Sequence, residues 1–242
     1  MLSNMKIVFE NVTKKFFKQE DRTLKELIPS LIKGMRAGEF INALKNISLN
    51  IEKGDTVGVL GRNGAGKSTL LKVIAGVTQP TQGKVVIEGK IAPLIELGAG
   101  FHPQLTGREN IYLNGSIFGL SKKQINEIFD EIVSFSELER FIDTPVKHYS
   151  SGMYMRLGFS VAVHTPFDIL LTDEILAVGD ADFQEKCINK MNSFKKQGKI
   201  IIFVSHALET VAAFCNKGLL LDKGNQIYYG GVDEAINRYK NL

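Results

Sequence analysis

Residues 61–69 read GRNGAGKST, and this stretch decides the fold predicted for the chain. It follows the short apolar run TVGVL (56–60), which is typical of a buried parallel strand. It leads into LLKVIAGV (70–77), which has helical character. The stretch matches the pattern G-x-x-x-x-G-K-[ST] in its required setting between a strand and a helix. The sequence therefore predicts a loop whose backbone N–H groups point at phosphate oxygens, helped by the dipole of the helix.

Each residue type in this loop has an expected task. Lys67 is expected to reach the β- and γ-phosphates of a nucleotide as a point charge. Ser68 is expected to place a hydroxyl on Mg²⁺, which prefers hard oxygen ligands. The alternative is a glycine-rich turn that binds nothing, and the strand–loop–helix setting argues against it. The candidate binding residues are Gly61, Arg62, Asn63, Gly64, Ala65, Gly66, Lys67, Ser68 and Thr69.

A second apolar run, in FDILLTDE (167–174), ends in two acids. Asp173 at the end of this predicted strand suits Mg²⁺, directly or through a water molecule. Glu174 follows it and is a candidate general base for an attacking water. The alternative is a pair of solvated acids, but nucleotide chemistry gathers at strand ends beside such a loop.

The remaining segments predict an α/β fold with a P-loop NTPase core and a mostly parallel sheet. An antiparallel β subdomain is expected at the N-terminus and an inserted helical subdomain at about 95–165, within one domain that spans 1–242. KIVFENV is expected to be an edge-type strand. A Lys-Gly-Asn turn is expected in the terminal hairpin. The predicted strands are 6–12, 41–55, 56–60, 83–89, 167–174 and 199–207, and the hairpin is 218–230.

Composition excludes several classes of protein. Hydrophobic residues make up 44% of the 242 residues and charged residues 23%, so a buried core is expected. The net charge of +4 is too small to indicate nucleic-acid binding, and we expect no nucleic-acid partner. Cys187 and Cys215 lack metal-like spacing, which favours buried thiols in a reducing compartment. No signal peptide or membrane span is predicted, so any work at a membrane would need a partner or a surface contact.

Four motifs together resemble a known family. In chain order they are the loop at 61–69, YSSGM (149–153), FDILLTDE (167–174) and FVSHA (203–207). Their order and spacing are those found in the nucleotide-binding subunits of ABC transporters. The resemblance covers nearly the whole chain. It implies an ATPase coupled to transmembrane transport, with ATP and Mg²⁺ as cofactors.

The resemblance also implies a homodimer. Two copies would face each other head to tail, and Ser150, Ser151 and Gly152 would complete the ATP site of the partner. YSSGM departs from the usual LSGGQ at two positions, because Ser151 replaces the second glycine and Met153 replaces the glutamine. An ordinary serine N-cap is the alternative interpretation of this stretch.

Three further positions carry roles by the same resemblance. Phe16 is expected to stack on adenine, with Phe17 as the near competitor and a buried core phenylalanine as the alternative. His206 is expected to contact the γ-phosphate and to hold the attacking water. Asp180 lies where the family has a loop that crosses the dimer interface.

One usual residue is missing. The family normally has a glutamine at the end of the strand before the helical subdomain, but this segment reads IAPLIELGAGFHP (91–103). Glu96 is the nearest polar candidate for its role, and Gln104 is the other.

A narrower resemblance concerns the cargo. The segments at 95–115, 134–143, 149–160 and 173–187 look like those of ATPase subunits that export lipid-linked polysaccharide, such as O-antigen, capsule or teichoic acid. This implies two membrane-spanning permease subunits as partners and a place at the cytoplasmic face of the membrane, reached through the permease. The alternatives are an ABC ATPase of another transporter class, a soluble ABC ATPase acting in translation or DNA repair, and a regulatory module without turnover.

Some members of that group carry a C-terminal β-sandwich that binds the end of the polymer. About a dozen residues follow the last predicted strand here, so we expect no such domain in this chain.

The segment at 17–42 predicts an amphipathic insertion. Its apolar residues recur at the spacing of one helix face, basic residues surround them, and Pro29 is expected to kink or split the helix. We expect it near the membrane surface or the permease, and the alternative is a helix packed on its own domain. The apolar residues are Leu24, Leu27, Ile28, Leu31, Ile32 and Met35, and the basic residues are Arg22, Lys25, Lys33 and Arg36.

Overall fold

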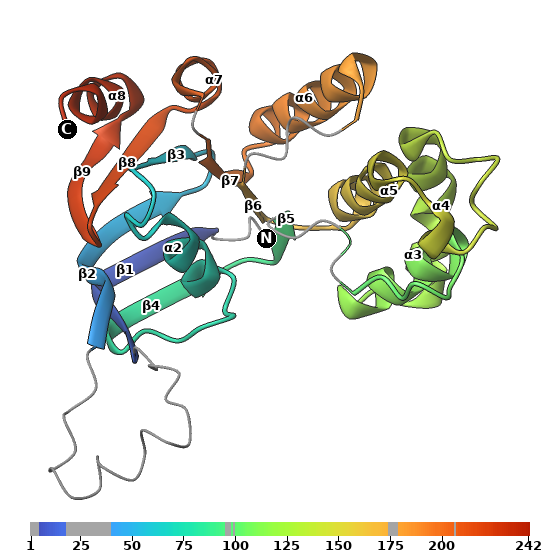
Figure 1. Cartoon of the computed structure of the whole chain (residues 1–242), viewed down its shortest axis with the longest axis horizontal. Coiled ribbons are helices and arrows are strands. Elements are labelled where there is room, and N and C mark those ends of the chain that lie inside the picture. Colours follow the sequence, from blue (N-terminus) through green and yellow to red (C-terminus); the bar gives the residue numbers. More distant parts are fainter. Residues whose placement is uncertain (1–4, 18–39, 95–97, 99, 174–178, 206) are drawn as a thin grey trace, which may run out of the picture.

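The computed structural model describes residues 5–17, 40–94, 98, 100–173, 179–205 and 207–242. In this part of the chain, nine strands form one mixed sheet in the order β4-β1-β2-β9-β8-β3-β7-β6-β5 (Figure 1). The strands are β1 (Lys6–Phe17), β2 (Phe40–Glu52), β3 (Thr56–Leu60), β4 (Gln82–Glu88), β5 (Ile91–Leu94), β6 (Ile169–Asp173), β7 (Ile200–Val204), β8 (Lys217–Asp222) and β9 (Asn225–Gly231). The helices are α2 (Lys67–Ile74), α3 (Gly107–Ile117), α4 (Lys122–Ser136), α5 (Ser151–His164), α6 (Ala181–Lys196), α7 (Leu208–Phe214) and α8 (Val232–Lys240), with a short 3₁₀ turn η1 (Val146–His148).

The parallel half of the sheet brings distant segments to one edge. β3 lies between β7 and β8, and β7 pairs in turn with β6, all in parallel. Every residue of β3 and β7 is buried, which explains their continuous apolar sequences. Because Asp173 is aligned with Val204 and Val59 is also aligned with Val204, the ends of β6, β7 and β3 lie beside one another.

The antiparallel half is formed by β1, β2 and β4, as the predicted fold class requires, and that class is confirmed. One detail of the prediction was wrong, because the strand expected at 6–12 as an edge strand has a neighbour on both sides and continues to Phe17. Alternation of apolar and polar residues reports that one face of a strand is exposed. It does not report whether the strand has a neighbour within the sheet.

Hydrophobic residues pack on both faces of the sheet. On one face α2 contributes Leu70, Leu71 and Ile74 to a core shared with β1 and β2. On the other face α6, α7 and α8 cover the parallel strands. The two cysteines lie in this second core, and burial raises the pKa of each thiol to about 12, so both are inert packing residues.

The helices α3, α4 and α5 form a separate lobe, which Figure 1 shows to the side of the sheet. They enclose a hydrophobic core of their own, which includes Ile111, Phe129, Ile132 and Leu157. The sequences TGRE (106–109) and SKKQ (121–124) start α3 and α4 as capping boxes, in which the first and fourth residues bond each other's backbone N–H groups.

The terminal hairpin has a tighter turn than expected. Asp222 is paired with Asn225, so Asn225 already belongs to β9 and only Lys223 and Gly224 form the turn. Both have positive φ, 45° and 82°, as a type I′ turn requires.

Of the insertion predicted at 17–42, residues 18–39 lie outside the described residues. Phe17 ends β1 and Phe40 begins β2, so the described ends of the insertion lie side by side in the sheet. Among the described residues, none of the helices combines the length and the apolar character that crossing a membrane demands.

A buried asparagine holds the connection from β5 to the helical lobe. Asn110 of α3 has no exposed surface, accepts a hydrogen bond from His102 N at 2.7 Å, and donates to His102 O and Leu105 O at 3.2 and 3.1 Å. Its buried amide therefore bonds the backbone of His102 and Leu105 and holds this stretch of loop against α3.

We predict that Asn110→Ala lowers the free energy of unfolding by about 1–3 kcal/mol, because it removes a buried amide that makes several hydrogen bonds to the backbone of the loop. Urea denaturation followed by circular dichroism measures the change. Asn126→Ala is the matched control, because Asn126 is exposed and accepts one hydrogen bond, from Tyr112. The control is expected to cost under about 1 kcal/mol, and equal losses in the two variants would contradict the prediction.

Candidate functional site

The loop between β3 and α2 is shaped by its glycines. Gly61 and Gly66 have φ of 154° and 108°, and a Cβ atom at either position would clash with backbone. At Gly61 it would lie 2.5 Å from the carbonyl oxygen of Leu221, and at Gly66 it would lie 2.5 Å from that of Ala43. These carbonyls belong to β8 and β2, so the neighbouring strands fix the path of the loop and allow only glycine there.

The turn of the β8–β9 hairpin contacts the backbone of the loop at 61–69. Gly224 N donates to Ala65 O at 3.0 Å, and Lys45 N donates to Gly224 O at 2.7 Å. The turn is thus hydrogen-bonded to both the loop and β2. Sequence reasoning missed this contact, because a Lys-Gly turn can be located from its residues but not placed against a particular partner.

Lys67 lies inside the loop. Its Nζ donates to Gly61 O at 2.6 Å and to Arg62 O at 3.2 Å, and only 9% of the residue is exposed. Lys67 also begins α2, and its N-cap residue Gly66 supplies no side-chain oxygen to the first turn. A positive charge and uncapped helical N–H groups therefore face the same space, which favours a bound anion.

That space is a cavity of about 380 Å³, a volume typical of ligand sites. Ser68 and Asp173 both line it, so a hydroxyl oxygen and a carboxylate oxygen are available to one divalent cation. This donor set fits Mg²⁺, which binds few protein oxygens and retains waters or phosphate ligands. The lining residues are Ile41, Asn42, Ala43, Asn63, Gly64, Ala65, Gly66, Lys67, Ser68, Thr69, Asp173 and Val204.

The two candidate aromatic residues point to opposite faces of the sheet. Phe16 is paired with Ile41 and Phe17 with Phe40, and cross-strand partners share a face. Ile41, the cross-strand partner of Phe16, is among the residues that line the cavity, whereas Phe17 packs edge to face on Phe40 with ring centroids 5.4 Å apart. Phe16 is 42% exposed, which excludes the alternative of a core residue.

The stretch YSSGM starts a helix far from this loop in the fold. Ser150 is the N-cap of α5, and its Oγ accepts a hydrogen bond from Met153 N at 3.2 Å. The cap uses a lone pair of the hydroxyl, so the O–H hydrogen is not consumed by it. Ser150 and Ser151 are exposed, and no residue of 150–152 is among those that line the cavity. Figure 1 shows α5 in the helical lobe and α2 against the sheet.

Three candidate residues, Glu174, His206 and Glu96, lie outside the described residues. Gln104, the alternative to Glu96, is described: it is exposed, accepts a hydrogen bond from Lys147 Nζ at 2.9 Å, and is not among the cavity residues. The structure therefore does not bring Gln104 to the loop at 61–69.

Asp180 has a defined place within its own chain. It is the N-cap of α6, and its Oδ1 accepts a hydrogen bond from Phe183 N at 3.0 Å. Two-thirds of its side chain is exposed. A contact across a dimer interface is compatible with this exposure and stays a prediction.

Residues 44–177 match the protein family described as ABC transporter. The O-antigen export system ATP-binding protein RfbB of Myxococcus xanthus is 47% identical over 241 residues, which cover 97% of this chain and 55% of the relative. The teichoic acids export ATP-binding protein TagH of Bacillus anthracis is 47% identical, with 98% and 42% covered. This chain thus spans about half the length of these two relatives. An RfbB of Klebsiella pneumoniae is 44% identical over 238 residues, with 97% of both chains covered.

Solved structures agree in fold. An ATP-binding subunit of an ABC transporter superposes with a TM-score of 0.77 at 22% identity, covering 98% of this chain and 93% of that one. A bacterial ABC transporter cassette, solved as a dimer, superposes with a TM-score of 0.73 at 26% identity, covering 93% and 98%.

We predict that Lys67→Ala weakens ATP binding by roughly 10- to 100-fold, because it removes a charge-assisted contact worth about 1.5–3 kcal/mol. Lys72→Ala, which removes an exposed lysine from the same helix, is the control and is expected to bind normally. Titration with a fluorescent ATP analogue measures both affinities. Equal affinities of the two variants would show that Lys67 does not contact phosphate.

Proposed function

Because the chain belongs to the ABC transporter family, we propose that it is the ATP-hydrolysing subunit of an exporter that moves lipid-linked polysaccharide across the cytoplasmic membrane. The observation that carries the ATPase proposal is the cavity in which the glycine loop, Lys67, Ser68 and Asp173 meet. The polysaccharide proposal is supported by relatives at 44–47% identity that are named for O-antigen and teichoic acid export.

The loop and the start of α2 bind the phosphates of ATP. Backbone N–H groups of residues 61–69 surround the phosphate oxygens, and the Lys67 ammonium neutralises the β- and γ-phosphates. Ser68 and Asp173 hold Mg²⁺, which supplies further neutralisation of the phosphate charge. Phe16, whose cross-strand partner Ile41 lines the cavity, stacks on the adenine.

Two copies of the chain complete each other's sites. Within one chain the Ser150–Gly152 stretch does not line the cavity, although it offers a hydroxyl and helical N–H groups to an anion. In a head-to-tail homodimer these donors contact the γ-phosphate held by the partner's loop. The similar bacterial cassette solved as a dimer supports the homodimer.

Hydrolysis uses residues that follow two adjacent strand ends. Asp173 and Val204 are aligned neighbours at the ends of β6 and β7, and Glu174 and Ser205–His206 are the residues that follow them in the sequence. Glu174 accepts a proton from the attacking water, and His206 holds that water and the γ-phosphate. Electrostatic stabilisation by the loop, Lys67 and the partner's donors contributes most of the rate enhancement.

The membrane partners are two permease subunits, and the dimer lies at the cytoplasmic face of the membrane through them. The helical lobe and the loop at about 95–105 transmit closure of the dimer to the permease. The insertion at 17–42 lies at the membrane surface or against the permease, near the entry of the lipid-linked polymer. The polymer is recognised by the complex, and no nucleic acid takes part.

We predict that Glu174→Gln produces a stable dimer in the presence of ATP with turnover reduced by at least about 100-fold, because the general base is lost while binding is kept. Analytical ultracentrifugation and phosphate release measure the two effects. Glu185→Gln, at an exposed position on α6, is the control and is expected to behave as the unmodified chain. Normal turnover of Glu174→Gln would exclude Glu174 as the base.

The same variant tests the transport proposal in cells. Replacing the native chain by Glu174→Gln is expected to abolish polysaccharide at the cell surface and to leave lipid-linked polymer inside, detected by immunoblotting of separated fractions. Unchanged surface polymer would contradict the export function without contradicting the ATPase.

A second prediction tests whether the sites are shared between chains. Gly152→Asp is expected to fold normally, because a Cβ atom there meets nothing nearer than Ser150 Oγ at 3.9 Å, but its charge would repel the γ-phosphate. Lys67→Ala and Gly152→Asp chains are each expected to be monomeric with ATP. Their mixture is expected to regain ATP-dependent dimers, because one site of the mixed dimer has an intact loop and an intact Gly152.

Sedimentation of the two variants, alone and mixed, measures this complementation. If the complete site lay within one chain, neither variant would possess one, and the mixture would stay monomeric. That result would overturn the shared-site arrangement.

A further inference from the structure

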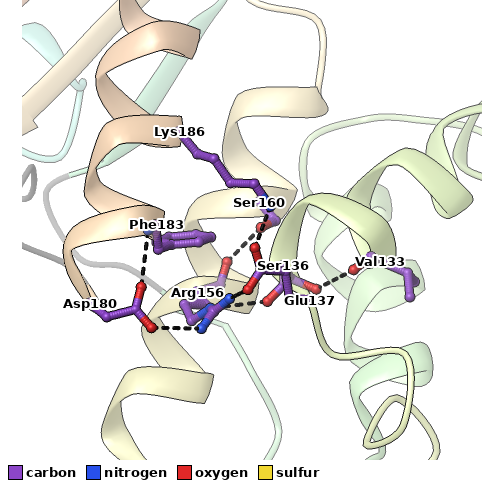
Figure 2. Close-up of polar contacts among 8 residues, drawn as sticks. All are labelled: Val133, Ser136, Glu137, Arg156, Ser160, Asp180, Phe183 and Lys186. Atoms are coloured by element: carbon purple, nitrogen blue, oxygen red, sulfur yellow. Dashed lines mark hydrogen bonds and ion pairs between the residues drawn. The ribbon is translucent and has the colours of Figure 1, made fainter.

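One arginine connects three helices beside the proposed signature. Arg156 lies on α5, and its Nε donates to Ser136 O, the last residue of α4, at 3.1 Å. Its two terminal nitrogens contact the carboxylate of Glu137 and, at 3.6 Å, that of Asp180 (Figure 2). Only 16% of this side chain is exposed. The end of α4 and the start of α6 are therefore joined through one guanidinium on α5.

The flat face of the Arg156 guanidinium lies over an aromatic ring. Its central carbon lies 4.6 Å from the ring centroid of Phe183, a fully buried residue of α6. Phe183 is itself in contact with Phe135 and Phe159, with centroids 5.7 and 6.2 Å away. Edge contacts and a stacking contact together determine both the position and the tilt of an arginine, which a lysine could not reproduce.

Glu137 is the unusual member of this group. It follows α4 with φ 56° and ψ 38°, a left-handed conformation that costs a residue other than glycine about 1 kcal/mol. Its carboxylate contacts both Arg156 and Lys186 of α6. The Lys186 hydrogen bond, and then Arg156, hold the pKa of Glu137 below its usual value, so the carboxylate is charged at neutral pH. The left-handed backbone at position 137 favours glycine, so any advantage of glutamate there comes from the contacts of its side chain.

The helices α5 and α6 begin beside residues that have different proposed roles. α5 starts with Ser150–Gly152, and Arg156 lies near the end of its second turn. α6 starts at Asp180, a few residues after Glu174 in the chain. A change in the position of α5 therefore acts on Asp180 directly, through the contact of Arg156.

We propose that Glu137 is a positioning residue that, by holding Arg156 against Asp180 and Phe183, fixes the signature end of α5 relative to the start of α6. This inference rests on the proposed function, in which Ser150–Gly152 serves the partner's ATP and Glu174 serves the chain's own. The Glu137–Arg156–Asp180 contacts then couple the two ATP sites of the dimer. Glu137 itself touches no nucleotide, so its loss leaves ATP binding by the monomer unchanged.

Glu137→Gly separates this role from a structural one. Glycine relieves the left-handed backbone, which offsets the loss of partly exposed ion pairs, so the melting temperature is expected to stay the same or rise. Two quantities are expected to change. In the Glu174→Gln background, the ATP concentration for half-maximal dimerisation rises by about fivefold, and in the otherwise unmodified chain kcat falls by a similar factor, each the size expected for the loss of a partly exposed ion pair. ATP affinity of the monomer, measured with a fluorescent analogue, is expected to remain within about twofold.

Two further variants sharpen the result. Glu137→Gln keeps the side chain and an acceptor oxygen but removes the charge, so it is expected to fall between the unmodified chain and Glu137→Gly. Glu139→Gln changes an exposed carboxylate two residues away and is expected to have no effect. Sedimentation at increasing ATP and steady-state phosphate release measure all three variants.

The outcomes are distinct. Dimerisation and kcat of Glu137→Gly that match those of Glu139→Gln would overturn the coupling role. A fall in melting temperature that parallels the loss of activity would also overturn it, because Glu137 would then act only through stability. If the Glu174→Gln chain itself forms no dimer with ATP, the proposed function fails and the coupling falls with it.

Discussion

The backbone path of residues 61–69 is the constraint on which the rest of the structure depends. The carbonyl oxygens of Leu221 and Ala43 lie 2.5 Å from where Cβ atoms of Gly61 and Gly66 would be, so strands β8 and β2 determine the path of the loop. The Lys223-Gly224 turn adds a hydrogen bond to this loop, from Gly224 N to Ala65 O. The geometry of a phosphate site made of backbone N–H groups thus depends on the strands around it, because no side chain in the loop can replace their support.

The N-cap residues of α2, α5 and α6 differ, and each suits the proposed role of its helix start. Gly66 gives α2 no side-chain cap, so the first N–H groups of α2 are directed to the cavity. Ser150 and Asp180 cap α5 and α6, and each accepts a backbone hydrogen bond. A serine hydroxyl can accept the cap bond and still donate to a phosphate, whereas a carboxylate is an acceptor only and repels an anion. Ser150 is therefore suited to a phosphate and Asp180 to an arginine.

The helix α5 is the element on which contacts from separate parts of the fold converge. Near its start, Tyr154 donates from its hydroxyl to Gly98 O at 2.9 Å, and its ring packs edge to face on Phe101. Two residues on, Arg156 contacts the end of α4 and the start of α6. One helix thus touches both the segment that leads into the helical lobe and the segment that follows Asp173. Movement of α5 in a dimer would reach both segments through packed and bonded side chains.

The sequence by itself determined the features that depend on near neighbours: the loop at 61–69, the acid at the end of β6, the serine that starts α5 and the α/β class. Glycine spacing, apolar runs and cap residues act within a few positions, so they are visible in the sequence. Tertiary structure alone decided which strands flank β1, that Phe17 packs on Phe40 while Phe16 pairs with Ile41, and that Arg156 meets Asp180. Those outcomes depend on the strand order and on contacts between residues far apart in the chain, and no local pattern encodes which distant carbonyl or carboxylate will lie opposite a given residue.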